Sequence, residues 1–455
     1  MNSHQQYIDL YRSHCDLLCA GSCAPLNAPR EQAAALLEAQ GLPGRKEERY
    51  KYTSADEAFA PDLGLNLRRA AFAGNPYEHY RCGVSGIGSA LYFVVNDVPC
   101  PAPAAVSSLL SGGALVCPLR QAAEICPVLL ERYYHKAACA DRDFRTGHDG
   151  VTLLNTMLAQ DGLLIYIPAG VRLEHPVQVV YIADAAAEML SVRRVLILAE
   201  AGAKASVLFC DHTEGKHHAV STQVAEVYAG EEAEVELYSL EETSPRNECF
   251  STFYVEQAAR SRVSYDCVTL TCGHSRNRLD VRLRGEGASV ELCGAVIADA
   301  SQRVDHNVLV EHLAPKCQSD MLYKYVLDGH STGAFAGKVY VASGAQQTLS
   351  RQTNANICAA PTARAYSQPM LEIYADDVKC NHGSTVGKLD EAALFYMRQR
   401  GIPEIEARLL LQHAFVNDVL RHVGIEALYE RLSRLVELRF RGELEHCRGC
   451  RVCLK

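Results

Sequence analysis

"AGAKASV" (residues 201–207) returns in altered form as "AGEEAEV" (229–235), "AARSRVS" (258–264) and "GEGASVE" (285–291). The valines at positions 207, 235, 263 and 290 are separated by 28, 28 and 27 residues. Small residues at a bend, followed by alternating strand residues, are typical of a stacked β-solenoid whose coils bury one another's inner faces. A β-sandwich also uses short strands, but it needs no regular repeat, so we favour the solenoid.

Composition limits the classes of protein to consider. A chain of 455 residues exceeds the usual size of one compact core, so we expect two or three structural units. The net charge of −9 provides no basic surface for nucleic acid. No apolar run approaches the roughly 20 residues of a membrane span, and "MNSHQQY" does not begin a secretory signal. We therefore expect a cytoplasmic protein that binds neither nucleic acid nor membrane.

Three regions are predicted along the chain. Residues 1–150 form an N-terminal helical or mixed region, in which the first 40 residues are helical. Residues 151–385 alternate short strands and turns, which predicts the solenoid core. Residues 386–455 contain three amphipathic helices, whose apolar faces we expect to pack on each other, and a cysteine-rich tail. The predicted fold is mainly β, with helices on both sides of the solenoid in the sequence.

A specific signature lies where the strand pattern ends. "PMLEIYADDVKCNHGSTVGKLDEAALFYMRQRG" (369–401) closely resembles the C-terminal signature of the SufB/SufD family of iron–sulfur cluster assembly proteins. "ADDVKCNHG" within it points to the SufD branch. Residues 318–329, 337–341 and 345–356 resemble the preceding coils of that family. "GLPGRKEERYKYT" (41–53) resembles its N-terminal connector, although Tyr50 stands where tryptophan is expected.

The resemblance implies a right-handed parallel β-helix between helical regions, and a cytosolic complex. In that complex SufD pairs with SufB, and each of them binds one SufC ATPase. SufD is implied to be a scaffold subunit linked to iron entry, not an enzyme, which agrees with the missing G-x-x-x-x-G-K-[ST] phosphate loop. We therefore expect a SufB-like partner, a SufC-like ATPase on the C-terminal helices, and a homodimer when the chain is alone. Iron or an iron–sulfur cluster would be bound only transiently, and the isolated chain need not hold either.

The candidate ligands lie in residues 371–382. If this stretch forms one strand, the side chains on one face are Glu372, Asp376, Cys380 and His382. The histidine implicated in the family falls on His382, and Cys380 is its neighbour. Thiolate, imidazole and carboxylate groups are ligands for iron or a nascent cluster, and a second chain would supply the remainder. The alternative is a strand-to-helix corner in which Cys380 is buried and an aspartate bonds turn amides.

The tail "CRGCRVC" carries a second candidate metal site. Its spacing C-x₂-C-x₂-C is typical of iron–sulfur and zinc ligands, here Cys447, Cys450 and Cys453. The family signature does not include this tail, and a fourth ligand is not obvious. The alternative is a flexible end that oxidises easily.

Two other functions compete with the scaffold. A carbohydrate-active β-helix enzyme would need paired carboxylates in a surface groove, whereas the acidic "AEVYAGEEAEVELYSLEE" (225–242) has the alternation of solvated strand positions. The third possibility is a chain that catalyses cluster assembly as SufB does. The sequence leaves open the cluster type, flavin binding and the choice between homodimer and heterodimer.

Overall fold

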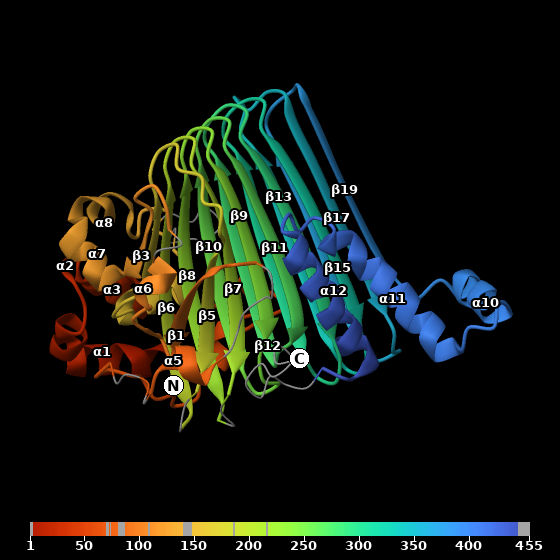
Figure 1. Cartoon of the computed structure of the whole chain (residues 1–455), viewed down its shortest axis with the longest axis horizontal. Coiled ribbons are helices and arrows are strands. Elements are labelled where there is room, and N and C mark those ends of the chain that lie inside the picture. Colours follow the sequence, from red (N-terminus) through yellow and green to blue (C-terminus); the bar gives the residue numbers. More distant parts are fainter. Residues whose placement is uncertain are drawn as a thin grey trace.

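The computed structural model describes residues 3–69, 72, 74–80, 87–107, 110–139, 148–184, 187–214 and 217–444. It is a parallel β-solenoid in which two long sheets face each other, with helices on their outer sides (Figure 1). The predicted fold, mainly β with flanking helices, is confirmed. Within the described ranges, no helix combines the length and the apolar character that crossing a membrane requires.

Successive strands of the solenoid alternate between two sheets, named A and B here. Sheet A contains β18 (Arg364–Ile373), β16 (Thr332–Val341), β14 (Arg303–His312), β12 (His274–Leu283), β10 (Glu248–Gln257), β8 (Ala219–Ala229), β6 (Met189–Ala199), β4 (Leu163–Ile167) and β3 (Leu115–Pro118), in spatial order. Sheet B contains β19 (Val378–Gly387), β17 (Thr348–Cys358), β15 (Gln318–Leu327), β13 (Ser289–Ala298), β11 (Arg262–Thr271), β9 (Glu234–Glu242), β7 (Lys204–Thr213), β5 (Val177–Ala183), β1 (Ala90–Val95) and β2 (Val98–Pro99). The coils pair in parallel, whereas β1–β2 and β3–β4 are antiparallel.

The repeated bends explain why this sequence coils. Each bend has one residue with positive φ, namely Gly202 (67°), Glu232 (60°), Arg260 (55°) and Gly287 (71°). A small, fully buried residue follows each of them: Ala203, Ala233, Ser261 and Ala288. Two of the four bends use a residue other than glycine, which costs roughly 1–2 kcal/mol each. The stacked coils therefore impose this turn even where the local sequence does not favour it.

The register corrects one step of the predicted repeat. Val235, Val263 and Val290 are direct neighbours across sheet B, as expected. Val207, however, pairs with Leu237, and the partner of Val235 is Ala205. The first predicted 28-residue interval is therefore wrong by two residues. Because side chains alternate with period 2, such a shift leaves Val207 on the same inner face, and the sequence pattern conceals it.

The N-terminal helices cover the outer face of sheet A. Helices α1 (Ser3–Ala20), α3 (Arg30–Gln40), α4 (Ala55–Ala58) and α9 (Gly150–Leu158) enclose an apolar cluster that includes Leu190, Val220 and Phe250 of the sheet. The other N-terminal elements are α2 (Ala24–Asn27), α5 (Pro76–His79), α6 (Ala104–Ser107), α7 (Leu119–Ile125), α8 (Pro127–Tyr133) and a 3₁₀ turn (Glu48–Tyr50).

The expected start of the strands at about residue 151 is wrong, because this stretch forms α9. Asp149 caps that helix by accepting a hydrogen bond from the Val151 amide, and its residues are all buried. The sheets also begin earlier than predicted, since β1 within residues 1–150 pairs with β5.

The three predicted C-terminal helices are α10 (Glu391–Gln399), α11 (Glu404–Leu420) and α12 (Glu426–Arg441). Their apolar faces pack on each other only in part, because α11 and α12 also cover the outer face of sheet B. Val416 and Leu420 of α11 and Leu428 of α12 are buried together with Leu270 and Ile297 on the outer face of sheet B. Helix α10 projects away from the solenoid (Figure 1).

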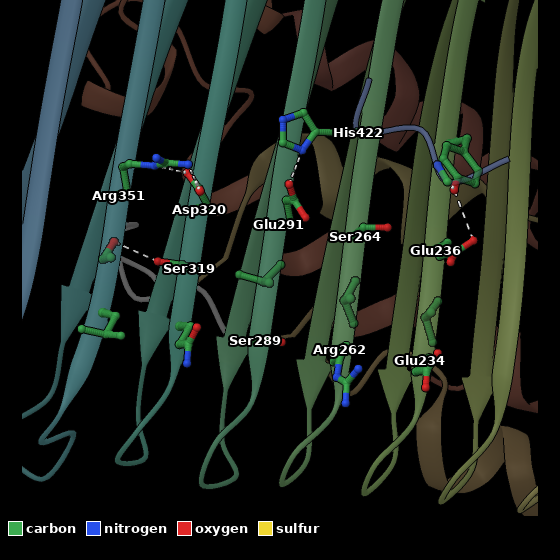
Figure 2. Close-up of a pocket in the computed structure, with 18 of the residues that line it drawn as sticks. Glu234, Glu236, Arg262, Ser264, Ser289, Glu291, Ser319, Asp320, Arg351 and His422 are labelled. Atoms are coloured by element: carbon green, nitrogen blue, oxygen red, sulfur yellow. Dashed lines mark hydrogen bonds and ion pairs between the residues drawn. The ribbon is translucent and has the colours of Figure 1, made fainter. Parts of the chain in front are cut away.

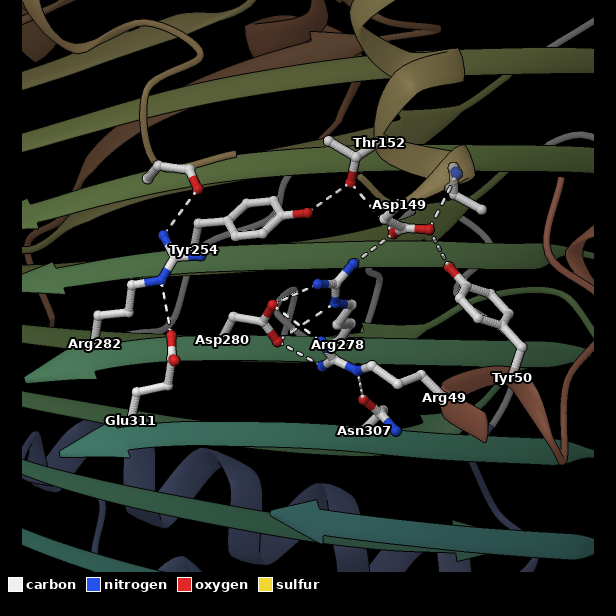
Figure 3. Close-up of polar contacts among 12 residues, drawn as sticks. Arg49, Tyr50, Asp149, Thr152, Tyr254, Arg278, Asp280, Arg282, Asn307 and Glu311 are labelled. Carbon is white, nitrogen blue, oxygen red and sulfur yellow. Dashed lines mark hydrogen bonds and ion pairs between the residues drawn. The ribbon is translucent and has the colours of Figure 1, made fainter. Parts of the chain in front are cut away.

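A buried ionic network fastens the N-terminal connector to sheet A (Figure 3). Arg49 Nη2 lies 2.6 Å from Asp280 Oδ1, and Arg278 also contacts Asp280. Arg278 reaches Asp149 at 2.7 Å, and the Tyr50 hydroxyl donates to Asp149 at 2.9 Å. Burial would raise the pKa of Asp280, but Arg278 and Arg49 outweigh it and hold that pKa below its ordinary value. The carboxylate therefore stays charged between two arginines.

We expect Asp280→Asn to lower the free energy of unfolding by about 3–5 kcal/mol, because it leaves two buried guanidinium groups without their shared anion. Urea unfolding followed by circular dichroism measures this change. The pKa of Asp280 is depressed in the folded state. Its contribution to the free energy of unfolding is therefore fully present above the ordinary carboxyl pKa of about 3.9, and it is lost as the pH falls from there through the folded-state pKa. The control Glu231→Gln, in an exposed ion pair with Arg260, should leave the midpoint unchanged. An unaltered midpoint for Asp280→Asn would contradict the assigned role.

Candidate functional site

The predicted ligands lie on the last coil of the solenoid, but not on one strand. Strand β18 ends at Ile373 and β19 begins at Val378, so residues 374–377 form a corner between the two sheets. The prediction of a single strand over residues 371–382 is therefore wrong. Asp376 is exposed in the corner. Glu372 is on β18 and pairs with Lys338 at 2.8 Å.

Cys380 and His382 do share one face of β19, and that face is the inner one. Val378 and Cys380 pack against the core between the sheets, and strand alternation places His382 on the same side. The column of directly paired residues that ends at His382 contains Val177, Val207, Leu237, Tyr265, Leu292, Met321 and Gln352. An imidazole thus occupies the core position of the last described coil, where it is exposed because no further described strand covers it.

The neighbouring column of paired inner residues also becomes more polar toward the last coil. Val235, Val263 and Val290 are followed by Ser319, Ser350 and Cys380. Cys380 is half-buried, and this burial raises the pKa of its thiol. At neutral pH the thiol is therefore protonated, and binding of a cation would have to displace its proton.

The interior under His382 is polar. Gln352 is 1% exposed, and neither of its side-chain amide atoms has a hydrogen-bond partner among the described residues. Asn356 Nδ2 donates to Asn354 Oδ1 at 2.7 Å and to the Thr385 carbonyl at 3.0 Å. Buried polar groups without partners are costly, so their concentration here departs from ordinary core packing. The end of the solenoid offers donors and acceptors to whatever covers it.

The candidates do not form a complete metal site. In the described part of the chain, Asp376, Cys380 and His382 do not meet as a three-donor group. Cys447, Cys450 and Cys453 lie outside the described residues. One three-donor group that the sequence analysis missed is present on the outer face of sheet B: Glu291, Cys293 and His422. The spacing Glu-x-Cys places the first two on one strand face, but nothing local in the sequence brings His422 to them.

The last coil also leaves two strand edges open. Sheet A ends at β18 and sheet B ends at β19. The backbone amides of Arg364 and Tyr374 donate hydrogen bonds to the carbonyl oxygens of Ser331 and Val341, which lie at the two ends of β16. Even-numbered amides of β18 therefore face β16, and odd-numbered ones face the open edge. Pro369 falls at an outward position, where its missing N–H costs no ladder bond.

Two family matches cover nearly the whole chain. The family described as "SUF system FeS cluster assembly, SufBD core domain" matches residues 181–415, and the "SufBD protein N-terminal region" matches residues 1–179. The chain belongs to the SufBD family of iron–sulfur cluster assembly proteins.

Individual SufBD relatives are similar at modest identity. An iron–sulfur cluster assembly SufBD family protein of Synechocystis is 28% identical over 302 residues, 64% of this chain and 67% of the relative. SufD of Bacillus subtilis is 26% identical over 317 residues, 68% of this chain and 70% of the relative. SufD of Escherichia coli is 30% identical over 167 residues, 37% and 40% of the two chains. The predicted resemblance to SufB/SufD proteins, and to SufD in particular, is confirmed.

In this SufBD chain, we expect alkylation of Cys380 by iodoacetamide to require a higher pH than alkylation of a small thiol of pKa about 8.5. The reason is the raised pKa of the half-buried thiol, since only the thiolate reacts. Mass spectrometry of the peptide containing Cys380 gives the rate at each pH, and a Cys380→Ser chain verifies the assignment of that peptide. A midpoint at or below that of the small thiol would contradict the described environment.

Proposed function

We propose that this chain is a SufD-like, non-catalytic scaffold subunit of a cytoplasmic SufB–SufC–SufD complex. In this role it aids iron entry and cluster formation at the interface with a SufB-like partner. Family membership and the named SufD relatives support the assembly role. The observation that carries the local assignment is the position of His382, in a core column at the uncovered end of the solenoid.

Cys380 and His382 suit an iron ion or a nascent cluster that is cargo and does not stay bound. Cysteine thiolate and neutral imidazole are both iron ligands, whereas Asp376 in the adjacent corner does not meet them as a third donor in the described structure. Two ligands on one strand hold a metal weakly, so the partner chain would have to supply the others. An incomplete site favours transfer, because separation of the two chains removes part of the coordination.

The open edges support a paired state. Strands β18 and β19 expose backbone donors and acceptors, and Ile373, Tyr374 and Val386 add exposed apolar side chains at this end. Pairing of two such ends would extend the sheets across the contact and cover the polar interior. We propose a heterodimer with the SufB-like chain and a homodimer when this chain is alone.

We expect His382→Ala to leave the fold intact and to reduce cluster formation in the complete complex. The imidazole is exposed, so its loss should change stability by less than about 0.5 kcal/mol. Anaerobic reconstitution, with iron and sulfide determined per complex, measures the yield. The control is His330→Ala, an exposed histidine in the turn between β15 and β16. A normal cluster yield from a well-folded His382→Ala complex would contradict the assigned role of His382 in cluster formation.

We propose that the SufC-like ATPase binds the exposed face of α10 and the start of α11. Phe395 of α10 is 61% exposed and Ile405 of α11 is 77% exposed. Deleting residues 388–455 is not a clean test, because α11 and α12 cover apolar side chains of sheet B. Substitution of the exposed side chains avoids that problem.

The double variant Phe395→Glu, Ile405→Glu should lose the co-purifying ATPase while its circular dichroism spectrum stays unchanged. Charges placed on an apolar contact surface oppose its burial. The control is Val128→Glu, which changes a 70% exposed side chain on the distant helix α8. Retention of the ATPase by the double variant would show that the contact lies elsewhere.

The cysteine tail stays a separate prediction. Cys447, Cys450 and Cys453 have the spacing of metal ligands, and the core-domain match ends at residue 415, well before them. We therefore assign them no part in the mechanism above.

A further inference from the structure

A group of mixed metal-binding donors lies on the outer face of sheet B, near the turn between α11 and α12. Figure 2 shows two of them, Glu291 and His422. Glu291 and Cys293 project outward from β13, and His422 follows the end of α11. One ligand atom from each of the three residues lies within 4.8 Å of the other two. His422 Nδ1 and a Glu291 carboxylate oxygen are in direct contact.

A buried carboxylate provides a second, independent indication of a cation. Asp266 is the direct neighbour of Cys293 across the β11–β13 ladder, and it is only 5% exposed. It accepts a hydrogen bond from the Cys293 thiol, while its Oδ2 atom has no hydrogen-bond partner in the described parts of the chain. A buried polar oxygen without a partner is costly, and a cation held by Cys293 beside it would offset that cost.

Sheet B and the α11–α12 turn, which carry these donors, are held together by other contacts. Tyr238 lies next to Asp266 in the same row of sheet B, and its hydroxyl accepts from the Gly424 amide at 3.2 Å. This bond ties the α11–α12 turn to the sheet two residues after His422. Apolar packing of both helices on sheet B holds the turn from either side. The histidine and the strand donors therefore belong to elements that are already docked.

Acidic side chains outnumber basic ones in the row of sheet B that contains Glu291. Glu236 and Asp320 lie in the same row as Glu291, with Ser264 between Glu236 and Glu291. Arg351 pairs with Asp320 (Figure 2), so that positive charge is already engaged. The surroundings thus favour a cation over an anion at this position.

We propose that Glu291, Cys293 and His422, with Asp266 hydrogen-bonded to Cys293 beside them, bind one divalent transition-metal ion of the borderline class, such as Zn²⁺ or Fe²⁺. A combination of one sulfur, one nitrogen and one carboxylate donor suits this class and not Mg²⁺ or Ca²⁺, which prefer oxygen ligands alone. On binding, the Cys293 thiol loses its proton to solvent and the thiolate becomes the ligand. The ion would join the α11–α12 turn to the solenoid.

This site is distinct from the one proposed at the open end. Glu291 and Cys293 are on the outer face of sheet B, whereas Cys380 and His382 are on its inner face at the last coil. The inference therefore does not rest on the proposed function, and either can fail without the other. Its test needs a chain in which the other candidate cysteines cannot contribute a signal.

The experiment uses the full chain carrying Cys380→Ser, Cys447→Ser, Cys450→Ser and Cys453→Ser, freed of metal by a chelator. Co²⁺ is the probe, because it substitutes for Zn²⁺ and its bond to a thiolate gives an ultraviolet charge-transfer absorption. We expect one equivalent of Co²⁺ to bind with this absorption, Zn²⁺ to displace it, and excess Mg²⁺ to leave it in place. No Co²⁺ binding, or displacement by Mg²⁺, would overturn the proposal.

Variants in the same background assign the ligands. Cys293→Ser should abolish the thiolate absorption, and Asp266→Asn should weaken Co²⁺ binding by about 10- to 100-fold. Cys139→Ser, at a half-exposed cysteine outside the site, is the matched control and should change neither. If Cys293→Ser does not fold, the Co²⁺ affinities of Glu291→Gln and His422→Gln test the proposal instead. Both side chains are exposed, so these substitutions should leave the fold intact. Unchanged affinity in these two, or unchanged absorption in a folded Cys293→Ser, would overturn the proposal.

Discussion

In a parallel solenoid the backbone of each coil is satisfied only by the coil beside it. Among the described residues, every strand from β6 to β17 has a parallel neighbour on both sides, whereas β18 and β19 have one each. The N-terminal end avoids the same difficulty because β2 and β3 close the two sheets with short antiparallel strands. The chain thus has one closed end and one open end, and the open end must meet water or another chain.

The side chains change character toward that open end. Inner columns that begin with valine and leucine finish with Gln352 and His382, or with Ser350 and Cys380. A terminal coil designed only to be capped by its own chain would keep apolar residues at these positions. The polar interior, the two open edges and the exposed histidine all agree with the proposal that a second chain completes this end. The SufBD family match gives that proposal a chemical purpose, the assembly of iron–sulfur clusters.

The repeat allowed much of the fold to be predicted from sequence, because bends and inner residues recur at nearly constant spacing. Errors arose where different conformations produce the same pattern. A two-residue shift keeps Val207 on the inner face, and a wholly buried helix such as α9 is as apolar as a strand. The break at residues 374–377 was hidden because polar residues also fit an exposed strand. The Glu291, Cys293 and His422 group could not be predicted, since it depends on where a helix turn 131 residues away docks.

The most direct test of the account is the mass of the isolated chain in solution. Static light scattering at micromolar concentration should give a dimer. Ile373→Pro should shift the chain toward monomer, because the amide of Ile373 faces the open edge and proline removes this donor without breaking the β16–β18 ladder. Ile373→Ala keeps the donor and serves as the matched control, which should stay dimeric. A monomer for the unmodified chain, or a dimer equally stable in Ile373→Pro, would contradict the claim that the open coil end is the pairing surface.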